Sequence, residues 1–181
     1  MGTPDISAAI IGRNGLGYLK KCVDAVRRSG THFSEILYVD DASTDGSPAW
    51  IADNHPEVRV LALKERKGPS HTRNEGIALA RSGLVLLIDC DACPAPDCAG
   101  LLAEKISQVP QAVLAVPRIM LEGTDTVQHG GGRCHFLGLS VFPDAWRKIP
   151  SSTPYPGPVR DPSTLYPLPP APCPLPSTLY P

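Results

Sequence analysis

Short apolar runs alternate along the chain with segments in which apolar residues recur every three or four positions. The runs at 6–11, 35–40, 58–63 and 84–88 are rich in Val, Ile and Leu and stop at polar or glycine-containing segments. Such runs are typical of parallel strands buried on both faces. The run at 84–88 is continuously apolar, which predicts a central strand, and a further run at 112–116 predicts a fifth strand.

Helices are predicted in the segments between these strands. The first begins at Leu16 and carries its apolar residues on one side, with Gly30 just after its end. Ser47 is expected to N-cap a short second helix whose first position is Pro48. Two more helices are predicted at 69–81 and 97–107.

The regular alternation of strands and helices predicts an α/β domain with a mostly parallel sheet flanked by helices. In such a sheet, ligands bind beyond the carboxyl ends of the strands. The pattern weakens after Pro117, where 128–132 is predicted to be a flexible loop and 134–142 one more short strand.

The composition changes sharply at the end of the chain. Residues 150–181 hold 12 of the 21 prolines and contain the pentapeptide Ser-Thr-Leu-Tyr-Pro twice. Proline at this density excludes helices and central strands and favours polyproline II or disorder. We therefore predict one globular domain over 1–149 and a disordered, proline-rich tail over 150–181.

Charge and hydropathy exclude several classes of partner. The formal net charge is −1 and the basic residues are scattered, so no footprint for a nucleic-acid backbone is present. No apolar run approaches the roughly 20 residues that span a bilayer. The first residues lack the features of a signal peptide, and a cytoplasmic location is the expectation.

Polar clusters directly follow three of the predicted strands, at 12–14, 40–45 and 89–91. These clusters should meet at one edge of the sheet. Asp89 and Asp91 are two positions apart on an extended backbone, so both carboxylates can face one hard divalent cation such as Mg²⁺ or Mn²⁺. Asp-x-Asp at a strand end can also be a simple turn.

Other residues at the same edge could hold a nucleotide. Asp40 or Asp41 can accept a hydrogen bond from a uracil-type N–H or from ribose hydroxyls, although part of 40–46 must serve as a turn. Arg73 and Asn74, in the first turns of the helix after residues 64–68, could approach a diphosphate or could form a solvated helix face.

Two other types of site are disfavoured. Glycines at 12, 15 and 17 have the spacing G-x-x-G-x-G, which differs from the dinucleotide-binding G-x-G-x-x-G and weakens an oxidoreductase hypothesis. Cys90, Cys93 and Cys98 lack the second pair that a four-ligand zinc site needs. We interpret these cysteines as small hydrophobic side chains near a strand end.

Five segments together resemble the nucleotide-sugar-binding half of family 2 glycosyltransferases. They are Ile-Ser-Ala-Ala-Ile-Ile-Gly-Arg-Asn at 6–14, Gly-Tyr-Leu at 17–19, Ile-Leu-Tyr-Val-Asp-Asp-Ala-Ser-Thr-Asp-Gly-Ser at 36–47, Gly68 with Arg-Asn-Glu-Gly at 73–76, and Leu-Leu-Ile-Asp-Cys-Asp at 86–91. The resemblance covers roughly residues 5–120. Its specificity lies in the order and spacing of the five segments.

The resemblance implies a GT-A fold and transfer of a sugar, with inversion, from a nucleoside diphosphate to an acceptor. Asp41, with Asp40 beside it, would hold the base and ribose, and Arg13 and Asn14 would line the nucleotide pocket. Asp89 and Asp91 would bind the metal through the diphosphate. A UDP- or dTDP-sugar is the favoured donor, because a carboxylate accepts from a pyrimidine N3–H.

The chain departs from the family beyond the metal motif. Members normally continue for about another hundred residues, which supply the acceptor site and the catalytic base, so we expect a truncated domain prone to self-association. No acidic residue after Asp97 stands in a convincing setting for the base. The alternatives are a noncatalytic adaptor whose proline-rich tail binds an aromatic groove, and another α/β enzyme such as a nucleotidyltransferase.

Overall fold

The structure is a computed structural model that describes residues 5–129, 133–134 and 140–141. The chain divides into two units, residues 1–117 and residues 118–181. The predicted tail at 150–181 lies outside the described residues. The extent of the predicted domain over 1–149 stays a prediction.

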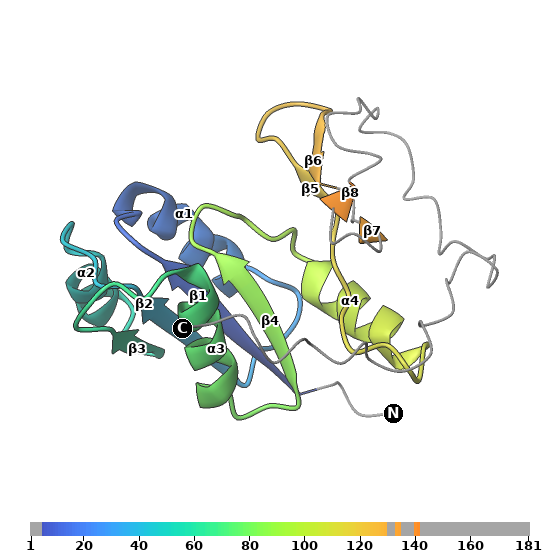
Figure 1. Cartoon of the computed structure of the whole chain (residues 1–181), viewed down its shortest axis with the longest axis horizontal. Coiled ribbons are helices and arrows are strands. Elements are labelled where there is room, and N and C mark those ends of the chain that lie inside the picture. Colours follow the sequence, from blue (N-terminus) through green and yellow to red (C-terminus); the bar gives the residue numbers. More distant parts are fainter. Residues whose placement is uncertain (1–4, 130–132, 135–139, 142–181) are drawn as a thin grey trace, which may run out of the picture. The chain divides into compact units, whose positions relative to one another are not determined.

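The first unit is built on a parallel sheet of four strands in the order β3-β2-β1-β4 (Figure 1). The strands are β1 (Ile6–Gly12), β2 (Glu35–Asp40), β3 (Val58–Ala62) and β4 (Leu84–Asp89). The helices between and after them are α1 (Leu16–Arg27), α2 (Ser47–Asn54), α3 (Pro69–Leu79) and α4 (Cys98–Ser107). The predicted α/β class, with a parallel sheet flanked by helices, is confirmed.

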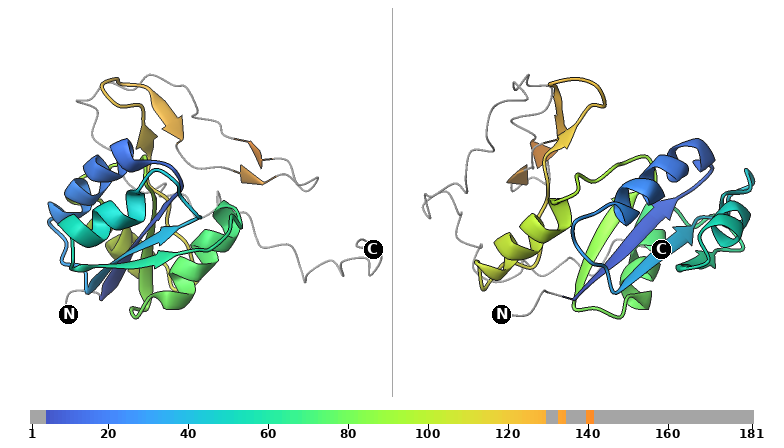
Figure 2. Two further views of the ribbon diagram at one scale, coloured as in Figure 1. Left: turned by 90° about the vertical axis from the view of Figure 1, so that its left-hand side faces the viewer. Right: turned by 180° about the vertical axis from the view of Figure 1, so that it is seen from behind.

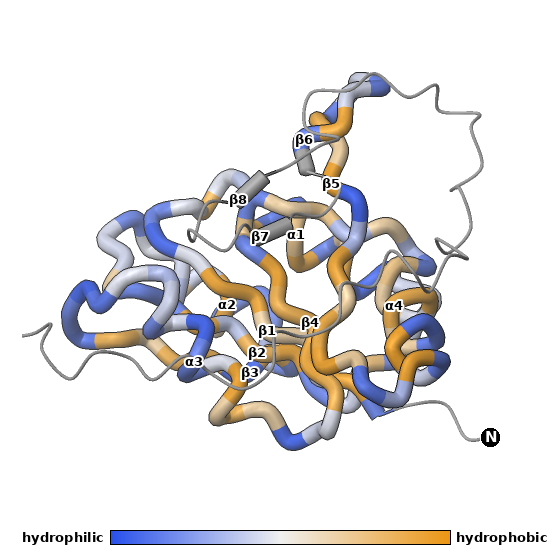
Figure 3. Tube along the Cα trace, turned by 45° about the vertical axis from the view of Figure 1, so that its right-hand side comes forward, coloured by the Kyte–Doolittle hydropathy of each residue, from blue (hydrophilic) through white to orange (hydrophobic). Residues whose placement is uncertain are grey.

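Helices cover both faces of this sheet, as Figure 2 shows, with α1 and α2 on one face and α3 on the other. All seven residues of β1 are buried, and successive residues such as Ala8 and Ala9 enter separate cores on the two faces. The apolar residues follow the strands, whereas polar residues gather in the loops at their ends (Figure 3). On the α3 face, Gly76 allows close packing, since a Cβ there would lie 3.3 Å from that of Ala9.

The second unit contains short antiparallel pairs. β5 (Ile119–Met120) pairs with β6 (Val127–His129), and β7 (Arg133–Cys134) pairs with β8 (Ser140–Val141). Gln128 and His129 therefore belong to a strand, and the prediction of a loop there was wrong; residues 130–132 lie outside the described part. The prediction of one strand over 134–142 was wrong, because Cys134 belongs to β7 and Ser140 and Val141 belong to β8, its antiparallel partner. Residues 135–139 and 142 lie outside the described part.

Two strand predictions need correction. β4 is an edge strand of the sheet within the described residues, because β1 is its only neighbour in the order β3-β2-β1-β4. Leu87 accordingly remains 38% exposed. The predicted strand at 112–116 is absent from the described chain. Val113 is 94% exposed and Pro110 and Pro117 bracket the segment, so its apolar residues neither pack nor join a ladder.

Two helix ends also differ from expectation. Gly46, not Ser47, is the N-cap of α2, with φ of 84°, and Ser47 is the first residue of the helix. Asp45 Oδ1 accepts the Ser47 N–H at 3.0 Å, so the carboxylate that satisfies this N–H comes from the residue directly before the N-cap. Helix α3 ends at Leu79, because Ala80 adopts an extended conformation that turns the next backbone N–H away from the helix.

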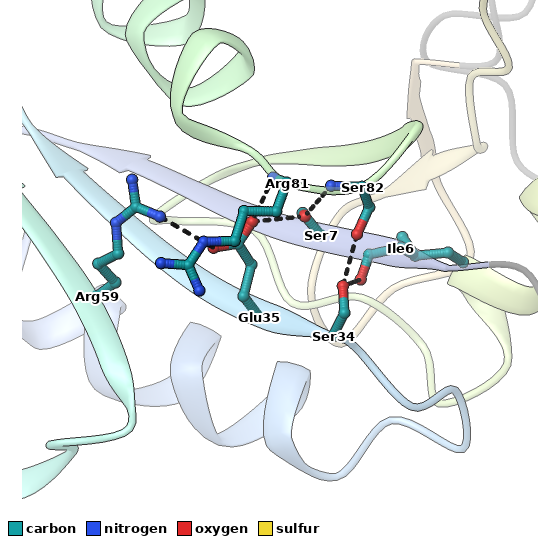
Figure 4. Close-up of polar contacts among 7 residues, drawn as sticks. All are labelled: Ile6, Ser7, Ser34, Glu35, Arg59, Arg81 and Ser82. Atoms are coloured by element: carbon teal, nitrogen blue, oxygen red, sulfur yellow. Dashed lines mark hydrogen bonds and ion pairs between the residues drawn. The ribbon is translucent and has the colours of Figure 1, made fainter.

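That N–H, from Arg81, donates to the largely buried carboxylate of Glu35 at the amino ends of the strands (Figure 4). The Glu35 side chain is only 10% exposed, and its Oε1 accepts from Arg81 N at 2.6 Å and from Ser7 Oγ at 2.8 Å. Its Oε2 accepts from Arg59 Nη1 at 3.2 Å. Glu35 thus joins β1, β2, β3 and the residues after α3 at the amino ends of the strands. The predicted site lies at their carboxyl ends.

Within the described residues, none of the helices combines the length and hydropathy needed to cross a bilayer. The cytoplasmic location stays a prediction.

Candidate functional site

The carboxyl ends of β1, β2 and β4 meet as predicted. The Cys90 N–H donates to Ile11 O at 2.8 Å, and the Asp41 N–H donates to Gly12 O at 2.9 Å. The hydrogen bonding of β1 with β2 and with β4 therefore continues for one residue past the ends of β2 and β4. The three polar loops leave the sheet side by side.

The loop after β1 is tied to the loop after β2 by side chains from each. Asn14, which adopts a positive φ of 51°, donates its backbone N–H to Ser43 Oγ, and its Oδ1 accepts the Thr44 N–H at 2.8 Å. In return, Asp45 Oδ2 accepts the N–H of Leu16 at 2.9 Å, at the first position of α1. The two loops form one hydrogen-bonded frame.

Asp40 holds the loop after β2 from the protein interior. It is 1% exposed, and its carboxylate accepts from the Tyr38 hydroxyl at 2.8 Å, from the Ser43 N–H at 2.7 Å and from the Ser43 hydroxyl. Burial and the Asp40 carboxylate raise the pKa of Tyr38, so the phenol remains a donor. Asp40 therefore holds the loop that presents Asp41, whereas its predicted contact with a nucleotide stays a prediction.

Asp41 connects the frame to the loop before α3. It is 5% exposed, and its Oδ1 accepts the Lys67 N–H at 2.6 Å while its Oδ2 accepts the Gly68 N–H at 3.0 Å. A carboxylate has about four acceptor sites, so these bonds leave capacity for a further donor. Asp41 also borders a cavity at this edge of the sheet.

The cavity has a volume of about 340 Å³. It is lined by residues from the ends of β1, β2 and β4, from the loop before α3 and from the first turns of α3: Ile11, Gly12, Arg13, Asp41, Arg66, Pro69, Thr72, Arg73, Asp89, Cys90 and Asp91. Five of the predicted site residues thus share one cavity, namely Arg13, Asp41, Arg73, Asp89 and Asp91.

Three predicted site residues do not line the cavity. Asn14 and Asp40 belong to the hydrogen-bonded frame behind it, and Asn74 is exposed elsewhere on α3. Conversely, Arg66 lines the cavity and was not predicted. The available signal was the basic segment at 64–67, directly before a helix that starts at the carboxyl edge of the sheet.

The acidic pair after β4 consists of two carboxylates with different surroundings. Both oxygens of Asp89 accept from Arg73 Nη2, at 2.7 and 2.9 Å. Asp91 is exposed and has no ion pair among the described residues. Two carboxylates suit Mg²⁺ or Mn²⁺, but no group of three metal-ligating side chains occurs in the described chain. These residues fit a cation that completes its coordination with phosphate and water.

Cys90 fills the space between the two aspartates and the loop after β1. A Cβ on Gly12 would lie 2.9 Å from the Cys90 sulfur, and one on Gly15 would lie 2.6 Å from it. Gly12 and Gly15, two of the three glycines that superficially resemble a dinucleotide-binding motif, therefore make room for this thiol. Burial raises the pKa of Cys90, and the charges of Asp91 and Asp89 act in the same direction. The thiol packs as a small apolar group; Cys93, in contrast, is exposed.

We predict that Gly15→Ala lowers the free energy of unfolding by about 1 to 3 kcal/mol, because the new methyl overlaps the Cys90 sulfur. In a Cys90→Ala background, which removes that sulfur, the same substitution should cost less than about 1 kcal/mol. Urea unfolding of the four chains measures the difference. Gly17→Ala is the control, since no atom beyond its chain neighbours and the backbone of its own helix lies within 4 Å of a Cβ there. An equal cost of Gly15→Ala in both backgrounds would contradict this packing.

Residues 7–155 match the sequence profile of the family described as glycosyl transferase family 2. The succinoglycan biosynthesis protein ExoO of Rhizobium meliloti is 30% identical over 95 residues, which are 52% of this chain and 27% of that protein. The SPbeta prophage-derived glycosyltransferase SunS of Bacillus subtilis is 32% identical over 107 residues, 59% of this chain and 24% of that one. The chain thus spans less than a third of these relatives.

Solved structures support the fold. S. aureus TarS 1-349 superimposes with a TM-score of 0.53 at 20% identity, over 67% of this chain and 41% of TarS. The same protein in complex with UDP-GlcNAc gives a TM-score of 0.52 at 21% identity, over 66% of this chain and 39% of TarS. The expected GT-A type of fold is confirmed. Because the family profile matches most of the 181 residues, the chain belongs to glycosyl transferase family 2.

Proposed function

We propose that the cavity at the carboxyl edge of the sheet binds a nucleoside-diphosphate sugar, and that the chain serves in transferring the sugar, with inversion, to an acceptor. The observation that carries the proposal is the convergence of Asp41, Arg73, Asp89 and Asp91 on one cavity in a chain of this family. The TarS structure with UDP-GlcNAc adds support, because that related fold accepts a nucleotide sugar.

The residues around the cavity suit different parts of such a donor. Asp41 is fixed by two backbone N–H groups and can accept from the N3–H of uracil or thymine, which favours a UDP- or dTDP-sugar. Arg13 and Arg66 are exposed on the cavity lining and carry positive charge toward a diphosphate. Neither makes an ion pair with any described residue.

Asp89 and Asp91 would hold a divalent cation together with the diphosphate. Such a cation supplies positive charge that stabilises the departing nucleoside diphosphate. The Lys67 and Gly68 N–H groups keep the Asp41 carboxylate in place, so little ordering of this residue is needed when the donor binds. The acceptor remains unidentified and no catalytic base is assigned. No observation favours the adaptor hypothesis, whose proline-rich segment lies outside the described residues.

Calorimetric titration with UDP tests this proposal. We expect affinity at least about tenfold higher with Mn²⁺ than with a chelator, because Asp89 and Asp91 would hold the cation and its charge would favour the diphosphate. Asp91→Asn should abolish the gain, whereas Asp53→Asn, which removes an exposed carboxylate on α2, should retain it. ADP should bind more weakly than UDP. Equal affinity with and without metal, or a preference for ADP, would contradict the proposal.

A further inference from the structure

The pairing of Arg73 with Asp89 blocks one of the two carboxylates that the cation needs. Arg73 projects from α3, and a single nitrogen, Nη2, lies 2.7 and 2.9 Å from the two oxygens of Asp89. This nitrogen contacts both oxygens, so Asp89 would be unable to offer the two oxygens together to a cation while the ion pair persists. Asp89 must therefore exchange its partner before it can ligate a metal in that way.

The surroundings show that this exchange is feasible. The Arg73 and Asp89 side chains are 38% and 53% exposed, so water screens their attraction and the ion pair is weak. Both border the same cavity as Arg13 and Arg66. A diphosphate in that cavity would offer the guanidinium of Arg73 strong acceptors.

We propose that Arg73 is a positioning residue that holds Asp89 until the cation and the diphosphate arrive together, and then transfers its hydrogen bonds to the diphosphate. This inference rests on the proposed function. It assigns Arg73 two opposite effects: the arginine competes with the cation when the nucleotide is absent and assists binding when the nucleotide is present.

Because of these two effects, the cation and the nucleotide should each raise the affinity of the protein for the other. A cation alone must displace Arg73 without providing it a new acceptor, whereas a cation with UDP provides the diphosphate. The factor by which UDP raises the affinity for Mn²⁺ must equal the factor by which Mn²⁺ raises the affinity for UDP. Part of that factor should depend on Arg73.

The experiment measures free Mn²⁺ by electron paramagnetic resonance in titrations of the full chain, with and without UDP. Without UDP, Arg73→Met should bind Mn²⁺ about fivefold more tightly than the parent, since the competing ion pair is gone. With UDP, the strengthening of Mn²⁺ binding should be at least about fivefold smaller than in the parent. Arg66→Met removes the same charge from the same cavity without touching Asp89, so it controls for the general loss of charge.

The outcomes separate this inference from the proposed function. If Arg73→Met and Arg66→Met bind Mn²⁺ equally well, or if UDP still strengthens Mn²⁺ binding by the parental factor in Arg73→Met, the role of Arg73 is wrong. If UDP and Mn²⁺ do not strengthen each other in the parent chain, the proposed function itself is wrong. Circular dichroism verifies folding, and Arg73→Gln replaces Arg73→Met if the latter does not fold.

Discussion

The Asp40→Ala variant is expected to unfold with a free energy about 3 to 5 kcal/mol lower than that of the parent chain. The substitution leaves three donors without their acceptor: the hydroxyl of Tyr38 and the N–H and hydroxyl of Ser43. Tyr38 is completely buried, so water cannot replace the lost hydrogen bond. Urea unfolding followed by fluorescence or circular dichroism measures the change.

A double-mutant cycle with Tyr38→Phe identifies the cause. Phenylalanine fills nearly the same volume but has no hydroxyl to satisfy, so Asp40→Ala should cost less in the Tyr38→Phe background, by about 1 kcal/mol or more. Asp40→Asn retains acceptor capacity and should be milder than Asp40→Ala. A loss below about 1 kcal/mol for Asp40→Ala would show that this carboxylate does not hold the loop.

The second large effect is expected at the other end of the sheet. Glu35→Ala should lower the free energy of unfolding by about 3 kcal/mol, since the Arg81 N–H and the Ser7 hydroxyl lose a charged acceptor. Glu35→Gln keeps an acceptor but removes the charge that faces Arg59 and Arg81, and should cost about 1 kcal/mol.

The same carboxylate predicts a dependence on pH. Burial disfavours the charged form of Glu35, but hydrogen bonds from Arg81 and Ser7 and the charges of Arg59 and Arg81 outweigh it and hold the pKa below its ordinary value of 4.5. The unfolded chain therefore takes up this proton first as the pH falls. The contribution of the charge is fully present above the unfolded pKa and is lost as the pH falls through the folded pKa.

Urea unfolding of the parent and Glu35→Gln between pH 7 and pH 3 tests this sign. The difference in unfolding free energy between the two chains should stay constant down to about pH 5 and then shrink. If the difference in unfolding free energy instead grows as the pH falls, the folded surroundings would disfavour the charged form of Glu35, which contradicts the prediction.

The fold could be predicted from sequence where local pattern and tertiary packing agree. Apolar runs gave the four strands of the sheet, and their alternation with helices gave its parallel topology. Two predictions about strands that rested on hydrophobicity alone were wrong. An apolar run at 112–116 has no partner to pair with in the described chain, and the most continuous run, at 84–88, forms an edge strand there.

The site was predictable to the level of which loops meet, because the carboxyl ends of parallel strands share an edge. Which of the side chains border the cavity and which only support the loops could not be predicted. Asp40 and Asp41 are neighbours in sequence, yet one is directed into the frame and the other borders the cavity. The Arg73 and Asp89 pair depends on how α3 lies against the sheet, which no periodicity in the sequence specifies.

The hydrogen bonds that tie the loop after β1 to the loop after β2 also constrain how this region can diverge. Asn14 and Asp45 reach across from opposite loops, so an insertion in either loop would break both connections. We therefore expect the lengths of these two segments, which lie about 30 residues apart in the sequence, to be constrained together. Side chains that line the cavity beside this frame, such as Arg13, can be exchanged without changing the loop lengths.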